Sequence, residues 1–466
     1  MTSRTIRSVL FVSLVLVAST GCRRFNGDKV RRDHAESYPQ ALAQVTEQVL
    51  AEKGALGLED CVRLALEHSL ETRSAEIQQR IAKLDRKIAF ANFLPRVSVD
   101  YMHYEFDPEI SLDLGGTALN IDKVRTVTWQ ANMSIFNPAT WFLYSMRKRG
   151  AEIAELVTDY TKQMTVLQVT LLYFQSLSLE EMDQALDADL AAAVALETEL
   201  RALHDEGLLS EWQADQAKVL IRARRFERDR MRRQLTESKA DLLAVMGLSP
   251  LAKLTLKAER PLETPAGTLP ELIVEALLCH PQLRIADRSV EIGKEQVKVA
   301  VTNFLPQLFG FVSFPDSLDD FIETSDQWMY GLSGTMTLFN GFANINEYKA
   351  ARERREKSFI EREQASLAVM LEVVKAHLML TTVTEQAELA QQVYDVTAKR
   401  LAETEQKWRE GLVNSSGLLD LRAECDKARV QAINARFQHQ VGTATLLNVM
   451  GKTKIDYEEP EHDGAS

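Results

Sequence analysis

The chain contains the same set of short motifs twice, in the same order, about 200 residues apart. Asn92-Phe93-Leu94-Pro95 recurs as Asn303-Phe304-Leu305-Pro306. Three later landmarks also recur: Ile135-Phe136-Asn137 as Leu338-Phe339-Asn340, Glu206-Gly207-Leu208 as Glu410-Gly411-Leu412, and Val245-Met246-Gly247 as Val449-Met450-Gly451. The period is far longer than that of a solenoid repeat. Residues 58–247 and 269–451 are therefore expected to share one architecture, with residues 248–268 as the linker between them.

Each copy is predicted to begin with a helix and to continue into two strands. The helices run from Leu58 to about Asn92 and from Leu269 to about Asn303, because the Leu-Pro that follows disfavours further helix. The strand from Val124 to Phe136 alternates apolar with polar residues, which is typical of a two-faced sheet. Its apolar positions are Val127, Trp129, Ala131, Met133 and Ile135, and those of its counterpart are Trp328, Tyr330, Leu332, Met336 and Leu338. The partner strands start near Val97 and Leu305, and a slip in alternation at Tyr101-Met102 predicts a β-bulge there.

An unusually long helix is predicted after each strand pair. These helices span Ala139 to His204 and Phe342 to Glu410, and about 65 residues at 1.5 Å each give a rod of roughly 100 Å. Apolar residues at four-three spacing predict a coiled-coil seam, and in the first copy they are Ile153, Val157, Tyr160, Met164, Leu167, Leu171, Phe174, Met182, Leu186, Leu190 and Leu200. Gly207 and Gly411 end the rods, since glycine readily adopts the left-handed conformation after a helix. A returning helix then runs to Met246-Gly247 and to Met450-Gly451.

The N-terminal residues 1–21 are predicted to be a secretory signal peptide. Arg4 and Arg7 precede an apolar run that stops at Ser19-Thr20-Gly21-Cys22, and the run is too short for a membrane span. Cys22 after Gly21 resembles a bacterial lipobox, so we expect a diacylated Cys22, carrying diacylglycerol and a fatty acid such as palmitate, as the anchor of residues 22–57. The alternative is an ordinary signal peptide with an incidental cysteine. Arg23 takes the place of the aspartate that retains lipoproteins in the inner membrane. Residues 452–466 form a polar tail.

Composition excludes several classes of function. The net charge of −12 argues against nucleic acid as a partner. Cys61, Cys279 and Cys425 are odd in number and widely spaced, so buried helical thiols are expected rather than a disulfide or metal framework. The eight histidines form no metal-binding cluster, and the chain contains no nucleophile-elbow, P-loop, HExxH or dinucleotide-binding motif. We therefore expect no enzyme, no metal and no cofactor besides the lipid.

The strand pairs match transmembrane barrel strands better than a soluble sheet. They are long, alternate apolar with small polar residues, and carry Trp129, Trp328 and Tyr330 where interface aromatics are expected. The alternative is a soluble sheet packed on the helices. Four strands cannot close a barrel, and an open edge in lipid leaves backbone groups unpaired. If the hairpins span a membrane, several chains must share one barrel.

The order of elements over residues 58–451 resembles the TolC-like outer-membrane efflux proteins, here as outer membrane factor lipoproteins. The resemblance also rests on the helix entry Ala276-Leu277-Leu278-Cys279-His280-Pro281-Gln282-Leu283 and on Phe339-Asn340-Gly341 after the second strand pair. It implies a homotrimer in which four strands per chain form a 12-stranded β-barrel, continued by a periplasmic α-helical barrel. It also implies a periplasmic adaptor (membrane fusion) protein and an inner-membrane pump as partners.

Two groups of residues correspond to functional positions of that family. The adaptor-docking tips are Gly207, Leu208 and Leu209 in the first copy and Gly411, Leu412 and Val413 in the second. The alternative is a purely structural role, in which glycine only caps the helix and the aliphatic residue closes the turn. An acidic ring at the periplasmic mouth is matched by Asp420, with Ala423 where a second aspartate is expected, and more weakly by Asp215. The alternative is a solvated aspartate on a helix surface.

These features predict an outer-membrane exit duct of a tripartite efflux or type I secretion system, lipid-anchored and extending into the periplasm. The alternative from another class is a lipid-anchored periplasmic coiled-coil scaffold or adaptor without a pore. An adaptor would hold a β-rich module beside one coiled-coil hairpin, whereas this chain interrupts two helical units with one strand pair each. The transported substrate cannot be inferred from the sequence.

Overall fold

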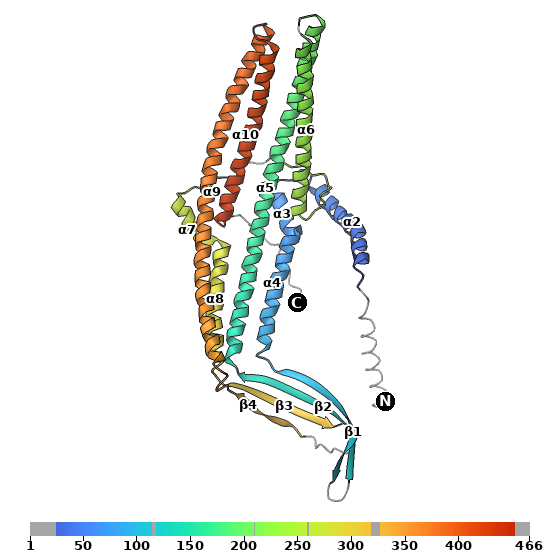
Figure 1. Cartoon of the computed structure of the whole chain (residues 1–466), viewed down its shortest axis with the longest axis vertical. Helices are drawn as coiled ribbons and strands as arrows, with labels where there is room; N and C mark the ends of the chain where they lie inside the picture. The colour runs from blue at the N-terminus through green and yellow to red at the C-terminus, as the bar shows by residue number, and fades with distance from the viewer. Residues whose placement is uncertain (1–24, 114–117, 209, 259–260, 318–326, 453–466) are drawn as a thin grey trace.

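The computed structural model describes residues 25–113, 118–208, 210–258, 261–317 and 327–452. The molecule is elongated, with two helical hairpins at one end and a curved four-stranded sheet at the other (Figure 1). The predicted signal peptide, Cys22, Leu209 and residues 453–466 lie outside the described residues. A helix not predicted from the sequence, α2 (Gly27–Lys53), precedes the first repeat.

The two long helices are confirmed. α5 (Pro138–Asp205) has 68 residues and α9 (Ala343–Arg409) has 67, so each is a rod of roughly 100 Å. Gly207 and Gly411 follow them with left-handed φ values of 76° and 75°. The returning helices are α6 (Glu211–Val245) and α10 (Ser415–Val449), and the Asn414 side chain caps α10 by accepting from Gly417 N at 2.9 Å.

Each predicted entry helix is two helices, so the prediction of one continuous helix was wrong. The first copy has α3 (Leu58–His68) and α4 (Leu70–Ala91), and the second has α7 (Leu269–Cys279) and α8 (Pro281–Thr302). Ser69 and His280 between them have ψ of 129° and 125°, outside the helical range. In the second copy Pro281 explains the break, because proline disfavours helix at the preceding residue.

The glycine of the recurring Val-Met-Gly motif packs against the first of these breaks. A Cβ on Gly247 would lie 2.2 Å from the His68 carbonyl oxygen, and Gly247 also has φ of 71°. Gly451 makes a looser equivalent approach, with the Cys279 carbonyl oxygen 3.3 Å from its ideal Cβ and φ of 69°. Glycine is therefore needed at Gly247 both for its backbone conformation and for the lack of a side chain.

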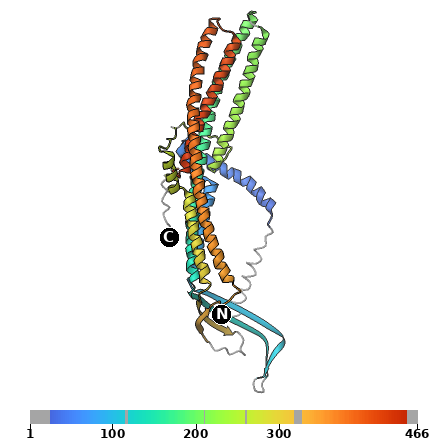
Figure 2. The ribbon, with the colours of Figure 1, turned by 60° about the vertical axis from the view of Figure 1, so that its left-hand side comes forward.

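The helices change neighbours along the length of the molecule. Near the sheet they lie in the order α4, α5, α8, α9, and beyond the sheet-distal ends of α4 and α8 the order becomes α6, α5, α10, α9 (Figures 1 and 2). In both layers α9 lies at one edge, while α4 and then α6 form the opposite edge. Between the layers, α3 and the linker close the larger core around the fully buried Tyr173, Leu242 and Met246, and α7 closes a second core with α9 and α10.

The predicted coiled-coil seam of α5 is only half correct. In the half distant from the sheet, Met182, Leu186, Leu190 and Leu200 are buried as predicted. Near the sheet, however, Val157 and Met164 are exposed, and Thr158 and Thr165 are buried instead. The small threonines allow α4 to approach closely: Thr158 donates to the Ala75 carbonyl at 3.2 Å, and the Thr72 and Thr165 hydroxyls lie 3.4 Å apart. The other stripe residues Ile153, Tyr160, Leu167 and Leu171 are half-buried, so this part of the stripe lies at the margin of the chain's own core.

The strands form one antiparallel sheet in the order β1-β2-β3-β4. They are β1 (Arg96–Asp113), β2 (Ala118–Phe136), β3 (Gln307–Ser317) and β4 (Met329–Thr335). Pairing of β2 with β3 joins the two repeats. Because Gln307, the first residue of β3, pairs with Thr335, β4 has no partner beyond it, and the predicted strand positions Met336 and Leu338 lie outside β4.

Two further predictions were wrong. The register irregularity between β1 and β2 falls between Glu105 and Ile110, whereas Tyr101 and Met102 pair regularly. Pro108, within the irregular stretch, has no N–H to donate to the ladder. Among the cysteines, Cys61 and Cys425 are buried, but Cys279 is exposed because it ends α7 at the surface.

The Gly247 packing gives a stability prediction. Gly247→Ala should lower the free energy of unfolding by about 2–4 kcal/mol. The loss comes from the strain of a non-glycine residue in the left-handed conformation and from overlap of the new Cβ with the His68 carbonyl. Thermal unfolding followed by helical circular dichroism measures it. The control is Gly207→Ala, where φ is 76° but no atom lies within 4 Å of the ideal Cβ, so only the backbone strain of about 1–2 kcal/mol remains. Equal losses at the two sites would contradict this account of Gly247.

Candidate functional site

The sheet has one apolar face and one largely polar face. Pairing places Val97, Ala131, Val312 and Tyr330 side by side on the apolar face, and Ser98, Gln130 and Ser313 on the other. No described element covers the apolar face: Val97 is 68% exposed, Leu332 74% and Tyr330 79%. The sheet also lies beyond the ends of the helices (Figure 1), so the alternative of a soluble sheet packed on the helices does not fit. A contiguous exposed apolar face marks a surface that contacts lipid or another protein.

Aromatic residues gather on this apolar face. Trp328, just before β4, packs against Phe314 with ring centroids 5.0 Å apart, and its side chain is 65% exposed. Trp129 on β2 pairs with Phe314 and is 52% exposed. The predicted aromatics Trp129, Trp328 and Tyr330 therefore share one surface, as membrane-interface aromatics do.

Both edges of the sheet are open. β1 pairs only with β2, and β4 only with β3, so the outer backbone groups of β1 and β4 have no strand partner within the described residues. Such edges are templates for pairing with another chain.

The helical layers have matching open edges that carry exposed apolar stripes. Each stripe has the three-, four- or seven-residue spacing of a coiled-coil seam, which faces a partner helix. On α4 the stripe is Ile77, Ile81, Leu84 and Ile88; on α6 it is Trp212, Val219 and Phe226; on α9 it is Ile360, Leu367, Leu371 and Leu378, followed by Leu389, Val393 and Val396.

The stripe on α9 also accounts for the helix's composition. Among the described helices, α9 alone contains an 18-residue stretch apolar enough to cross a membrane, and only 28% of that stretch is buried. Because α9 packs along α8 and α10, its remaining apolar surface belongs to an open edge of the layer.

The helix tips both cap their helices and expose aliphatic side chains. Leu208 N donates to the Leu203 carbonyl and Leu412 N to the Lys407 carbonyl, each at 2.9 Å, which satisfies carbonyl groups at the helix ends. The Leu208 and Leu412 side chains are nevertheless 69% and 70% exposed, and Val413 is half-buried. The two interpretations of the tips are therefore compatible.

The two candidate mouth aspartates differ in their surroundings. Asp420 is exposed and forms no ion pair with any described residue. Asp215 is also exposed, but Lys218 Nζ lies 2.7 Å from its Oδ1, and this hydrogen bond lowers the pKa of the Asp215 carboxyl. Leu418 and Leu419, which directly precede Asp420, are buried against Leu196 and Leu200 of α5. These contacts hold the start of α10 against the other hairpin.

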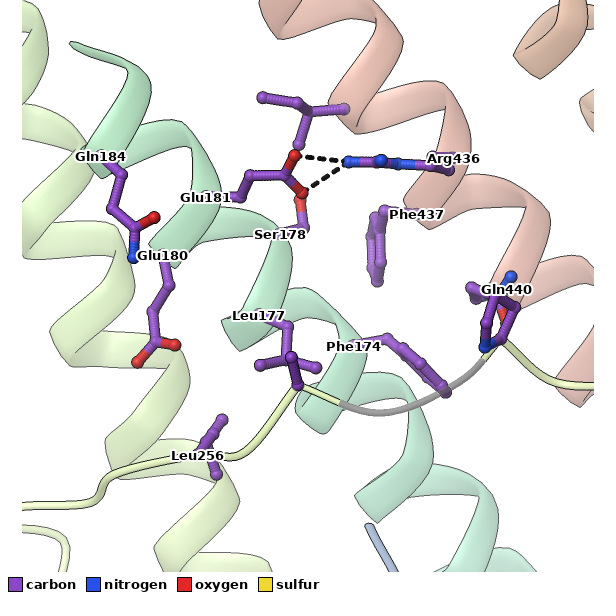
Figure 3. Close-up of a pocket in the computed structure, with 13 residues that line it drawn as sticks. Phe174, Leu177, Ser178, Glu180, Glu181, Gln184, Leu256, Arg436, Phe437 and Gln440 are labelled. Carbon is purple, nitrogen blue, oxygen red and sulfur yellow. Dashed lines mark hydrogen bonds and ion pairs between the residues drawn. The ribbon is translucent and has the colours of Figure 1, made fainter. Parts of the chain in front are cut away.

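An open cavity of about 500 Å³ lies where α5, α10 and the linker meet (Figure 3). Phe174 and Phe437 line it, and the Arg436 guanidinium binds the Glu181 carboxylate at its rim, at 2.5 and 2.6 Å. Within the described residues no group of three or more His, Cys, Asp or Glu side chains could hold a metal ion.

One functional candidate was missed from the sequence: a buried cluster of charges between the hairpins around Asp426. The sequence pattern that could have revealed this cluster is an acidic residue within the otherwise apolar buried face of α10. It lies in the segment Leu421-Arg422-Ala423-Glu424-Cys425-Asp426.

The comparison with protein families identifies the second repeat. Residues 272–452 match the model of a family described as outer membrane efflux protein. These residues belong to that family. The predicted resemblance to TolC-like efflux proteins is confirmed for this repeat. No curated protein matches the chain in sequence.

Solved structures extend the likeness to most of the chain. The CmeC outer membrane channel of Campylobacter jejuni aligns with a TM-score of 0.75 at 16% identity, covering 86% of this chain and 87% of that one. For VceC of Vibrio cholerae the TM-score is 0.72 at 15% identity, covering 88% and 98%. For the MtrE outer membrane channel of Neisseria gonorrhoeae it is 0.72 at 16%, covering 86% and 91%. At these identities the structures establish the fold alone: both repeats of this chain have the fold of such channels.

The apolar sheet face yields a prediction with a matched control. Leu332→Arg should destabilise the protein in lipid by about 2–4 kcal/mol if Leu332 faces the bilayer. Gln130→Arg, on the polar face of the same sheet, should cost much less. Urea unfolding in phospholipid vesicles measures both changes. Equal effects of the two substitutions would show that the apolar face does not contact lipid.

Proposed function

We propose that this chain is the outer-membrane exit duct of a tripartite efflux or type I secretion system. The observation that carries the proposal is the alignment of open edges along the molecule. A sheet with one apolar face and two unpaired edges continues, on the same two sides, into helical layers with apolar stripes on their outer helices. Repeating this unit around an axis would pair every edge and enclose a passage.

Three copies in a homotrimer fit this geometry, with β4 of each chain beside β1 of the next. Four strands per chain would then give the 12-stranded barrel that the family resemblance implies, large enough to leave a passage. In the helical part, the α9 stripe would pack against α4 and α6 of the neighbouring chain. The polar face of the sheet, with Ser98, Gln130 and Ser313, would line the duct.

The proposed location is the bacterial outer membrane, with the helices reaching into the periplasm. Diacylation of Cys22 would add an anchor on the periplasmic side. Support comes from the sequence around Cys22 and from the outer membrane channels with the same fold. The function would be passive: the duct supplies a path, and an inner-membrane pump supplies the energy.

The helix tips are the proposed docking ends for a periplasmic adaptor protein. The proposed docking residues are Gly207, Leu208 and Leu209 after α5, and Gly411, Leu412 and Val413 after α9. The two helical hairpins turn at the end of the molecule farthest from the sheet (Figure 1). The exposure of Leu208 and Leu412 provides apolar contacts there. Around a threefold axis, Asp420 of each chain would narrow the mouth and favour cations, and Asp215 is a weaker candidate because Lys218 already neutralises it.

A lipid-anchored scaffold without a pore explains less of the structure. It would leave the apolar sheet face and both sheet edges exposed to water, where they promote aggregation. The family matched by residues 272–452 also favours the channel.

Single-channel conductance of the full-length, detergent-extracted protein in a planar bilayer tests the function. We expect discrete openings that favour cations, and a clear loss of cation preference in Asp420→Ala. Asp215→Ala should change selectivity much less, because Lys218 already screens Asp215. A protein that is monomeric and never conducts would contradict the channel proposal and favour the scaffold.

A further inference from the structure

A basic groove lies where α5, α8 and α9 pack together in the helical layer next to the sheet. The groove is a cavity of about 500 Å³ lined by four cationic side chains and one aromatic ring. The cationic side chains are between 35% and 50% exposed, so solvent and other molecules can reach them. The residues that define the basic groove are Arg149 of α5, Arg288 and Lys294 of α8, and Phe359 and Arg362 of α9.

The carboxylates that pair with these cations do not balance their charge. Three carboxylates bind the four cations, and one of the three, Glu152, is shared by two arginines. Each arginine uses a single nitrogen in these pairs, although a guanidinium group has five N–H donors. Most donors of the groove are therefore not used in these pairs. The pairs are Arg149 and Arg288 with Glu152, Arg362 with Asp287, and Lys294 with Glu291.

A fifth cation lies close to the groove. Arg355 of α9 packs against α8, where its Cα is 3.3 Å from the ideal Cβ position of Gly293. Its Nε is buried and has no hydrogen-bond partner within the part of the chain that the structure describes. The hydrogen bond from Lys294, together with the nearby charge of Arg149, lowers the pKa of the Glu291 carboxyl. The basic groove is thus suited to a further acidic partner.

The C-terminal segment of the chain begins beside α8. Gly451 lies against the break between α7 and α8, where its ideal Cβ would be 3.3 Å from the Cys279 carbonyl oxygen. The next residue, Lys452, forms an ion pair with Glu275 of α7. Residues 453–466 therefore start at the end of α8 that is farthest from the sheet.

This segment is acidic, unlike its counterpart after the first repeat. The counterpart is apolar, and its Leu248, Leu254 and Leu256 are buried in the larger core. An acidic segment cannot take such a place, because burial of unpaired charges is costly. A basic surface is the partner that its charge favours. Between residues 453 and 463 the segment carries one lysine, Lys454, and five carboxylates: Asp456, Glu458, Glu459, Glu461 and Asp463.

The acidic residues can reach the cations of the basic groove. Arg288 and Lys294 lie about 12 and 21 Å along α8 from its first end, at 1.5 Å per residue. An extended chain covers up to about 3.6 Å per residue, so Asp456 and Glu459 can lie as far as about 14 and 25 Å from Lys452. The two charge patterns therefore have matching spans.

We propose that the acidic C-terminal segment, residues 456–461, binds in the basic groove of its own chain and thereby ties α5, α8 and α9 together near the sheet. Tyr457 lies among the acidic residues and packs on Phe359, which is 36% exposed and lies under Lys294. A single exposed ion pair contributes little. The segment is tethered close to the groove, however, and this raises its effective concentration there.

Photo-cross-linking of the full-length protein tests this contact. Tyr457 is replaced by benzoylphenylalanine, which keeps an aromatic ring and every charge of the segment, and the adducts are mapped by mass spectrometry. We expect adducts on α8 and α9 around Phe359. Raising the salt concentration from about 0.05 M to about 0.5 M should lower their yield at least about threefold, because salt screens exposed charges.

Mixing isotopically heavy and light chains shows whether each adduct forms within one chain. We expect adducts between segments of equal isotopic composition. Absence of adducts on α8 and α9, adducts mainly on another surface, or adducts that join a heavy chain to a light one would overturn the proposal.

Two charge reversals on α9 make the test specific. Arg362→Glu should lower the adduct yield at least about threefold, because it replaces a cation of the basic groove with an anion. Arg354→Glu makes the same change at an exposed position of the same helix that does not line the groove, so the yield should stay nearly unchanged. Equal effects of the two substitutions would contradict the proposed binding site.

A variant of the segment itself covers the case in which Arg362→Glu does not fold. Glu458→Gln combined with Glu459→Gln leaves the described helices untouched and should also lower the yield at least about threefold. An unchanged yield would overturn the proposal. The contact is within one chain and does not rest on the proposed channel, so its failure would leave the channel proposal standing.

Discussion

Backbone groups at the edges of a β-sheet need hydrogen-bond partners, and in lipid no water is present to supply them. The four strands of this chain leave two such edges, at β1 and at β4. Everything else about the molecule is compatible with edges that close between chains. The apolar face of the sheet is uncovered, and the outer helices α4, α6 and α9 expose apolar stripes along the edges of the helical layers. Under the proposed function, a single chain is therefore one part of a larger barrel.

Duplication explains how one chain builds such a fragment. Each repeat supplies two strands, one long rod and one returning helix, and β2 of the first repeat pairs directly with β3 of the second. In the proposed trimer, the contacts between chains would repeat the contacts inside the chain, which are those of β2 with β3 and of α5 with α8 and α10. The two hairpins are also joined within the chain by the ion pair of Arg224 on α6 with the buried Asp426 on α10.

The repeat made much of the fold predictable from the sequence. Gly207 and Gly411 could be recognised as the ends of the long helices because they occupy equivalent positions in the two repeats. The alternation of apolar and polar residues around Trp129 identified the apolar face of the sheet. Features that depend on spatial neighbours were not predictable. The stripe containing Val157 and Met164 was predicted as a coiled-coil seam, but the helix that it faces could not be predicted, and the structure buries Thr158 and Thr165 instead. The break at Ser69 has no proline to signal it, unlike the break before Pro281. Asp426 could not be recognised as part of a buried ion pair, because its partner Arg224 lies on another helix.

The central claim is that the edges of the sheet close between chains, and cysteine cross-linking tests it most directly. Ser333→Cys on β4 would be combined with Ser98→Cys or Asp100→Cys on β1, all on the polar face of the sheet. The account predicts that oxidation of the membrane-embedded protein links three chains and no more for at least one pair. Absence of any cross-linked species, or a ladder that continues beyond three chains, would contradict a closed trimeric barrel.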